Sequence, residues 1–128
     1  MAPVGRESVL VVRGRDERLR AFLNVCRHRG AALCTESAGE LRGSLQCRYH
    51  AWTYDLEGRL VGAPNMRDDP DFRHDDHGLV AVGVQVSHGL VFVSLADQPG
   101  QLAEQGEIDH PRLGNYDIEG LQLCGSLS

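Results

Sequence analysis

The chain has 128 residues, a net charge of −5 and a mean hydropathy of −0.29, values that fit one domain with a hydrophobic core of its own. All 13 basic residues are arginines, scattered without aromatic partners, which argues against a nucleic-acid-binding protein. No apolar stretch is long enough to span a membrane and the N-terminus lacks a signal-peptide core, so we expect a cytoplasmic location.

The N-terminal part of the chain predicts a pair of strands. Residues 1–7 contain proline, glycine and charged residues and are expected to form a loose extension. Residues 8–13 and 19–25 are rich in Val and Leu and predict strands, joined by a turn at 14–17. A short turn between consecutive strands favours antiparallel pairing.

The rest of the chain predicts further short strands and little helix. Residues 64–77 are polar and are expected to form a loop with at most one helical turn. From residue 97 the pattern changes to loops, with a short helix or the start of a strand at 117–123. We therefore predict an all-β antiparallel sandwich or barrel, with further strands at 41–46, 52–55, 60–63, 79–86 and 90–95.

Two loops of this sandwich each carry one cysteine and one histidine, Cys26 with His28 and Cys47 with His50. The pattern is C-x-H, eighteen residues and then C-x-x-H, which places four soft or borderline metal ligands in two tight pairs. Zinc sites usually pair Cys with Cys and His with His. Mixed pairs fit better a two-iron, two-sulfide centre in which both cysteines bind one iron and both histidines bind the other. Each loop would then touch both irons, so the loops should lie side by side at one end of the fold.

The charge of such a centre predicts its reduction potential. Two ferric ions, two sulfides and two thiolates sum to zero when the imidazoles are neutral, whereas four thiolates would leave two negative charges. A neutral core accepts an electron more easily, so we expect a potential of about −150 to +300 mV rather than about −400 mV.

Around these ligands the chain resembles the Rieske iron–sulfur domain. The closer resemblance is to the N-terminal domain of the large (alpha) subunits of Rieske non-haem iron ring-hydroxylating oxygenases, and it covers most of residues 8–96. It is carried by N-V-C-R-H-R-G-A at 24–31, C-R-Y-H-A-W-T-Y-D at 47–55 and G-L-V-F-V at 89–93. Two positions depart from the pattern: many members have proline in place of Arg48 and glycine in place of Ala51.

The resemblance implies an electron-transfer domain of an aromatic-ring-hydroxylating dioxygenase or monooxygenase. It would hold a Rieske [2Fe-2S] cluster, accept single electrons from a ferredoxin or flavin reductase, and pass them to a mononuclear non-haem iron in a neighbouring subunit of an oligomer. Residues 8–96 would form the Rieske domain and 97–128 the start of a linker to a catalytic domain outside this chain. We therefore expect no catalytic residue here, and substrate contacts elsewhere.

Two alternative functions remain at this point. One is a stand-alone Rieske ferredoxin, although residues 50–55 and the long tail after residue 95 look more like an oxygenase. The other is a structural zinc-binding module, which would be colourless.

Four residues near the ligands are expected to support the cluster. Gly30 would let the backbone approach it closely because glycine has no Cβ, and Arg29 would lie beside it. Trp52 is interpreted as an apolar shield, as a core residue, or as both. The hydroxyl of Tyr54 could donate to a cysteine sulfur and stabilise the reduced state, but a half-exposed strand tyrosine is the preferred interpretation.

Arg27, Arg29 and Arg48 crowd the two loops. They could form a docking surface for an acidic ferredoxin, pair locally with acidic residues such as Asp55, or simply be solvated. The sequence alone does not choose between these three interpretations.

The remaining histidines and cysteines are given minor roles. Asp71, His74 and His77 have the residue types of a two-histidine, one-carboxylate iron site, but a solvated loop is the preferred interpretation. His88 and His110 stand alone in the sequence, and Cys34 and Cys124 are expected to be free thiols.

Overall fold

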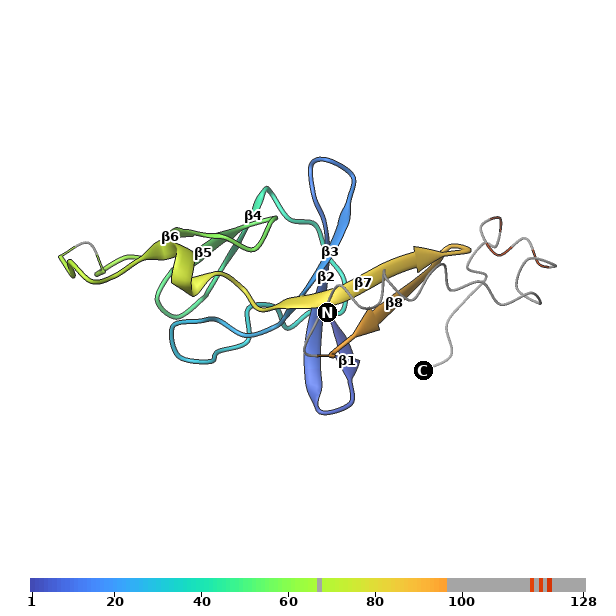
Figure 1. Ribbon diagram of the computed structural model, residues 1–128, viewed down its shortest axis with the longest axis horizontal. Coiled ribbons are helices and arrows are strands. Elements are labelled where there is room, and N and C mark those ends of the chain that lie inside the picture. Colours follow the sequence, from blue (N-terminus) through green and yellow to red (C-terminus); the bar gives the residue numbers. More distant parts are fainter. Residues whose placement is uncertain (67, 97–115, 117, 119, 121–128) are drawn as a thin grey trace. The chain divides into compact units, whose positions relative to one another are not determined.

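The protein is described by a computed structural model covering residues 1–66, 68–96, 116, 118 and 120 (Figure 1). The chain divides into two units, Met1–Val82 and Gly83–Ser128. The predicted element at 117–123, His110 and Cys124 lie outside the described residues, apart from the isolated positions 118 and 120. No helix of the described residues is long and apolar enough to cross a membrane.

The first unit is organised on an antiparallel sheet in which residues 9–13 of β2 (Glu7–Arg13) pair with the whole of β3 (Leu19–Leu23). Val9, Leu10 and Val12 of β2 are buried, so the Val- and Leu-rich segment contributes directly to the core. The first part of the chain is not a loose extension, because β1 (Ala2–Val4) pairs with β2. The prediction that residues 1–7 form a loose extension was therefore wrong. Pro3 does not prevent a strand here, because β1 lies at the edge of the sheet, where the missing N–H of proline costs little.

A second sheet carries the second cysteine–histidine segment. It contains β4 (Ser44–Gln46), β5 (Thr53–Asp55) and β6 (Leu60–Gly62), all antiparallel. Because Gln46 pairs with Thr53, the intervening loop is closed at its base by the ladder. The strands are shorter than predicted at 41–46, 52–55 and 60–63, but they fall inside those ranges.

The end of the chain's described part is a long hairpin. A short 3-10 helix, η1 (His74–His77), precedes β7 (Ala81–Ser87), which pairs with β3 through Ala81 and Val82. In the second unit the rest of β7 pairs with β8 (Leu90–Ser94). The two-residue turn at His88 and Gly89 has φ of 49° and 72°, as a tight hairpin with the twist of its strands requires.

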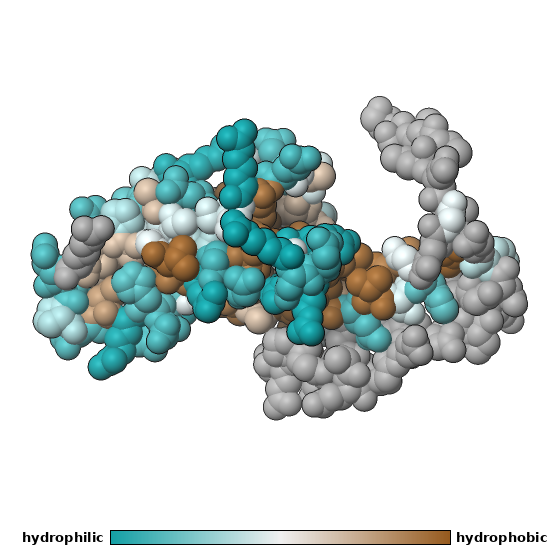
Figure 2. Space-filling view, turned by 90° about the horizontal axis from the view of Figure 1, so that it is seen from above, coloured by the Kyte–Doolittle hydropathy of each residue, from teal (hydrophilic) through white to brown (hydrophobic). Residues whose placement is uncertain are grey.

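The core of the first unit lies between its two sheets and the loops that join them. Gly58 packs so closely on the ring of Phe22 that a Cβ there would overlap it, and its φ is 84°. Figure 2 shows a largely hydrophilic outer face with hydrophobic residues in separate small groups. The buried core cluster comprises Leu10, Val12, Phe22, Cys26, Leu33, Leu45, Cys47, Trp52, Tyr54, Leu56, Leu60, Ala63 and Leu79. The prediction of an all-β antiparallel fold is confirmed.

Candidate metal centre

The first cysteine–histidine segment is a tight turn that starts at Cys26. The N–H of Gly30 donates to the carbonyl of Cys26 at 2.9 Å, and the N–H of Cys26 donates to the carbonyl of Ala31 at 2.7 Å. Gly30 has a φ of 74°, a conformation that favours glycine, and a Cβ there would meet no protein atom within 4 Å. The backbone conformation therefore explains this glycine, and its close approach to a cluster stays a prediction.

The second segment repeats the same turn. The N–H of Ala51 donates to the carbonyl of Cys47 at 3.0 Å, and the N–H of Cys47 donates to the carbonyl of Trp52 at 2.8 Å. Ala51 stands where the first turn has Gly30, and its φ is 56°. An alanine here adopts the left-handed conformation at an energetic cost. The two loops are thus equivalent in backbone although they differ in sequence.

The two turns bring all four predicted ligands to one cavity of about 240 Å³, which is also lined by Arg29. The cysteines form its inner side, because Cys26 and Cys47 are 1% and 2% exposed. The histidines form its outer side: His28 is half-buried and His50 is exposed, with ring centroids 4.5 Å apart. The sulfur donors are therefore shielded from water while the imidazole donors face outward.

His28 is suited to bind a metal ion as a neutral imidazole. Its Nδ1 is buried and has no hydrogen-bond partner in the described part of the protein, so its lone pair is not used by the fold. Burial lowers the pKa of His28, and the neighbouring His50 and Arg29 lower it further. A buried nitrogen without a partner is costly, which indicates that a ligand completes it.

Tyr54 is fully buried and contacts the first loop. Its hydroxyl lies 3.4 Å from Sγ of Cys26 and accepts a hydrogen bond from the N–H of Arg27 at 3.0 Å. Burial raises the pKa of Tyr54 above its usual range, and the adjacent Cys26 adds to this rise, so the phenol keeps its proton as a donor. The preferred sequence interpretation, a half-exposed strand tyrosine, was wrong, because β5 runs beneath the loops rather than along the surface.

Trp52 is a core residue that also packs against one of the predicted ligands. It is 2% exposed within the core cluster, and its ring stacks on His28 with centroids 4.8 Å apart and planes 14° apart. The core interpretation of Trp52 therefore holds, and its role as an apolar shield beside the cluster stays a prediction.

Asn24 holds the long part of the first loop, a role that the sequence analysis did not assign. Its Oδ1 accepts hydrogen bonds from the N–H groups of Leu33 and Cys34 at 3.0 and 2.9 Å. Its Nδ2 donates to the carbonyl of Cys34 at 2.7 Å and to Oγ of Ser8 at 3.1 Å. The available signal was a polar residue inside a Val- and Leu-rich segment, two positions before a ligand, because a buried amide must have its hydrogen bonds made.

The loop arginines do not pair with the acidic residue considered for them. Asp55 instead binds Arg59 at 2.7 Å across the β5–β6 turn. In the described part of the chain Arg27, Arg29 and Arg48 are exposed and form no ion pair. Local pairing with Asp55 was therefore a wrong interpretation, which leaves docking and solvation.

In the described part of the chain, Asp71, His74 and His77 are not brought together as ligands of one metal ion. Among the residues the structure describes, no three His, Cys, Asp or Glu side chains are placed to hold a single metal ion. The Nδ1–H of His77 donates to the carbonyl of Arg73 at 2.9 Å, and His77 packs against Trp52. The solvated-loop interpretation holds for His74, which is exposed, but His77 is half-buried.

The four predicted ligands all line the same cavity. Two cysteines and two histidines have the residue types of a two-iron centre with two protein ligands on each metal ion. Two buried thiols, an unpartnered imidazole nitrogen and room between the loops are what a [2Fe-2S] group requires.

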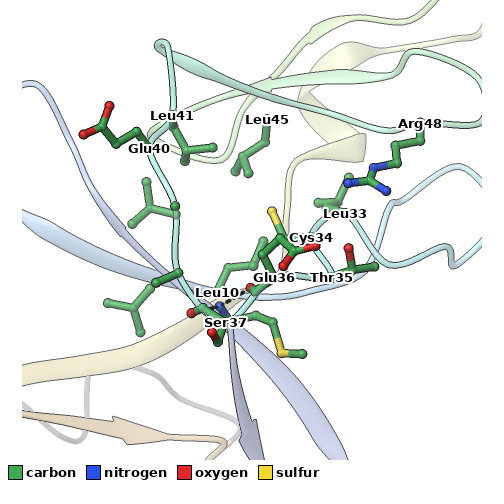
Figure 3. Close-up of a pocket in the computed structure, with 15 residues that line it drawn as sticks. Leu10, Leu33, Cys34, Thr35, Glu36, Ser37, Glu40, Leu41, Leu45 and Arg48 are labelled. Carbon is green, nitrogen blue, oxygen red and sulfur yellow. Dashed lines mark hydrogen bonds between the residues drawn. The ribbon is translucent and has the colours of Figure 1, made fainter. Parts of the chain in front are cut away.

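A larger cavity of about 390 Å³ borders the later part of the first loop and is lined by none of the four ligands. Leu10, Leu33, Leu41 and Leu45 and the half-buried free thiol of Cys34 line it, and Arg48 reaches it from the second loop (Figure 3). This placement separates Arg48 from Arg29, which lines the cavity of the ligands.

Comparisons with known proteins agree with this geometry. Residues 2–73 match the family model of the Rieske [2Fe-2S] domain. The oxygenase subunit of glycine betaine monooxygenase from Chromohalobacter salexigens is 48% identical over 94% of this chain, and the alpha subunit of biphenyl 2,3-dioxygenase from Rhodococcus jostii is 35% identical over 93%. This chain covers 27% and 28% of those two relatives, so it spans about a quarter of their length.

Solved structures show the same likeness. The quaternary ammonium Rieske monooxygenase CntA in complex with its substrate L-carnitine has a TM-score of 0.72 and 35% identity, over 76% of this chain and 27% of that one. Naphthalene 1,2-dioxygenase with bound indole has a TM-score of 0.69 and 33% identity, over 82% of this chain and 24% of that one. From its sequence, fold and ligand cavity, the chain belongs to the Rieske [2Fe-2S] domain family, of the kind found in Rieske oxygenase alpha subunits, and its cofactor is a Rieske-type [2Fe-2S] cluster.

Proposed function

We propose that the chain is the electron-transfer part of a Rieske oxygenase. Cys26 and Cys47 would hold one iron of the cluster, and His28 and His50 the other. The observation that carries this proposal is the single cavity bordered by all four side chains, with the cysteines inside and the histidines outside. When bound, the cluster accepts and releases one electron at a time.

The chain's own residues would protect one side of the centre and open the other. The thiols and Tyr54 are withdrawn from water, whereas His50 is exposed. Electrons would therefore enter and leave at the imidazole side, where a partner can come close to the cluster.

We further propose that the oxygenase acts on a quaternary ammonium compound rather than on an aromatic ring. Glycine betaine monooxygenase subunits are 43% to 48% identical to this chain, compared with 35% for the biphenyl dioxygenase subunit. The quaternary ammonium monooxygenase is also among the similar solved structures, with a TM-score of 0.72 compared with 0.69 for naphthalene 1,2-dioxygenase, so the sequence identities carry the proposal. In this proposal the substrate is bound by parts of the oxygenase other than these 128 residues.

Arg27 and Arg29 support an acidic electron donor, such as a ferredoxin, as the partner. They are exposed and form no ion pair among the described residues, beside a cavity opening in a chain whose net charge is −5. A local positive patch on an acidic protein guides an acidic partner to this face rather than to the rest of the surface.

Metal analysis with electron paramagnetic resonance tests the ligand set. The purified chain should hold two irons and two sulfides per molecule and give a Rieske-type signal after reduction with dithionite. Cys26→Ser and His50→Ala should lose this signal, whereas Cys34→Ser, a matched control outside the ligand set, should keep it. A colourless zinc-containing protein, or a Cys26→Ser variant with an unchanged signal, would contradict the proposal.

A further inference from the structure

The ring of His28 is held by stacking rather than by hydrogen bonds. A metal-binding histidine is usually oriented by a hydrogen bond from its second nitrogen. The structure gives the His28 ring no such bond in the described residues, and its nearest ring neighbours are Trp52 and His50. Trp52 lies almost parallel to it, at 14°, so the indole plane defines the imidazole plane.

Trp52 itself has no hydrogen bond to hold its side chain. Its Nε1 is buried and lacks a hydrogen-bond partner in the described part of the chain, and the residue as a whole is only 2% exposed. Its position therefore depends on packing alone. Two further rings meet it edge to face: Phe72 at 5.6 Å and His77 at 5.5 Å between centroids.

Phe72 and His77 come from a segment outside both ligand loops, and that segment is well anchored. The two rings contact each other at 4.6 Å. The Nδ1–H of His77 caps the carbonyl of Arg73 at 2.9 Å, which fixes its ring over the turn. At the end of η1 the N–H of Leu79 donates to the carbonyl of Gly58 at 2.7 Å, which ties the segment to the β5–β6 turn.

We propose that Phe72 and His77 are positioning residues for the cluster, acting through Trp52 on His28. They form an aromatic clamp, defined as Phe72 and His77, which keeps the indole against the ligand ring and keeps water away from that side of the centre. This inference rests on the proposed ligand role of His28. It gives Phe72 and His77, two of the three ring-bearing residues of the 71–77 segment, a function that requires no second metal.

The clamp predicts the direction of a change in reduction potential. With two thiolates and two neutral imidazoles the oxidised centre is neutral, and the reduced centre carries one negative charge. Water stabilises the charged state more than an apolar wall does. Removing a clamp ring should therefore raise the reduction potential, and it should also alter the reduced-state resonance signal by freeing the His28 plane.

The test compares variants of the full chain carrying its cluster. His77→Ala and Phe72→Ala should raise the potential, change the resonance g-values and increase acrylamide quenching of Trp52 several-fold; Trp52 is the only tryptophan in the chain. His77→Phe restores an aromatic ring and should return all three quantities toward wild type. His74→Ala is the matched control, since His74 lies on the same turn and contacts Phe72 but not Trp52.

The outcomes separate this inference from the proposed function. A wild-type chain without a two-iron cluster would end both. A wild-type cluster whose potential and g-values are unchanged in His77→Ala and Phe72→Ala, while Trp52 becomes more exposed, would reduce the clamp to ordinary packing and overturn the inference alone. If an alanine variant does not fold, His77→Leu, which keeps apolar volume without a ring, decides by the same two quantities.

Discussion

At the scale of single residues, the contact between Tyr54 and Cys26 links the buried strand to the metal centre. The phenol lies 3.4 Å from the sulfur and remains protonated because burial raises its pKa. A hydrogen bond to a thiolate stabilises the more negative, reduced state. The residue should therefore raise the reduction potential of the centre.

Replacing Tyr54 by Phe should lower that potential. If the differential strength of the bond is about 1 kcal/mol, the shift is roughly 40 mV, since 59 mV corresponds to a tenfold change for one electron. A spectroelectrochemical titration of both proteins measures it. An unchanged or higher potential in the variant would show that the hydroxyl does not donate to the sulfur.

The raised pKa of Tyr54 also predicts a pH dependence of stability. The unfolded chain releases the phenolic proton near pH 10, whereas the folded chain retains it. The resulting stabilisation is fully present below pH 10 and is lost as the pH rises through the higher folded-state pKa. Subtracting the absorbance titration of Tyr54→Phe from that of wild type should reveal a step well above pH 10; a step at the ordinary position would refute the burial argument.

The two positive-φ positions of the ligand turns form a matched pair. Gly30 and Ala51 have φ of 74° and 56° at equivalent places. Gly30→Ala should destabilise the protein by about 1 kcal/mol, because alanine is strained there. Ala51→Gly should relieve that strain, partly offset by the entropy of the unfolded chain, for a net gain of roughly 0 to 1 kcal/mol. Thermal unfolding of both variants checks the pair, and a marked loss in Ala51→Gly would contradict the common geometry.

At the scale of elements, the two ligand loops are held in place in different ways. The side chain of Asn24 holds the first loop, and the flanking strands hold the second. The β4–β5 ladder closes the second loop, whereas residues 33 and 34 of the first are fastened by the Asn24 side chain. The side chain is 3% exposed, so its four hydrogen bonds have no water to replace them.

Asn24→Asp should therefore loosen the first loop and release the cluster. The carboxylate keeps the two bonds from Leu33 and Cys34 but loses both donated bonds and brings a buried charge. We expect a loss of about 2–4 kcal/mol, seen as bleaching of the visible absorbance at a temperature lower by at least about 10 °C. Ser8→Ala, which removes only one of the four bonds, is the graded control. Equal bleaching temperatures for Asn24→Asp and wild type would exclude this role.

Some features of the fold and of the metal centre can be predicted from the sequence, and others cannot. The spacing of Cys26, His28, Cys47 and His50 predicts the ligand set because metal chemistry restricts residue types and short distances. The β-branched runs predict β2 and β7 because strand propensity is a local property, although burial does not alternate along β7. β1 was not predicted because proline is rare in strands, and Pro3 stands in the middle of this edge strand. The burial of Tyr54 and the contact of His77 with Trp52 depend on how distant segments pack, which no local pattern encodes.

At the scale of the whole molecule, an acidic chain presents two exposed arginines at its metal centre. If these arginines guide an acidic donor, the double variant Arg27→Gln/Arg29→Gln should be reduced by a plant-type ferredoxin several-fold more slowly at low salt, with a weaker dependence on ionic strength. Stopped-flow absorbance measures this rate. Arg18→Gln, an exposed arginine in the β2–β3 turn, is the control. Equal rates for the double variant and wild type would remove the docking role.

We propose that one metal ion of the centre is bound by two histidines and the other by two cysteines. Pulsed electron paramagnetic resonance of the reduced protein tests this most directly, because it detects nitrogen nuclei bound to the ferrous ion. We expect two distinct histidine nitrogen couplings that disappear together when the cluster is lost in His50→Ala. A reduced centre with no nitrogen coupling, or with only one, would contradict the assignment of His28 and His50 as its ligands.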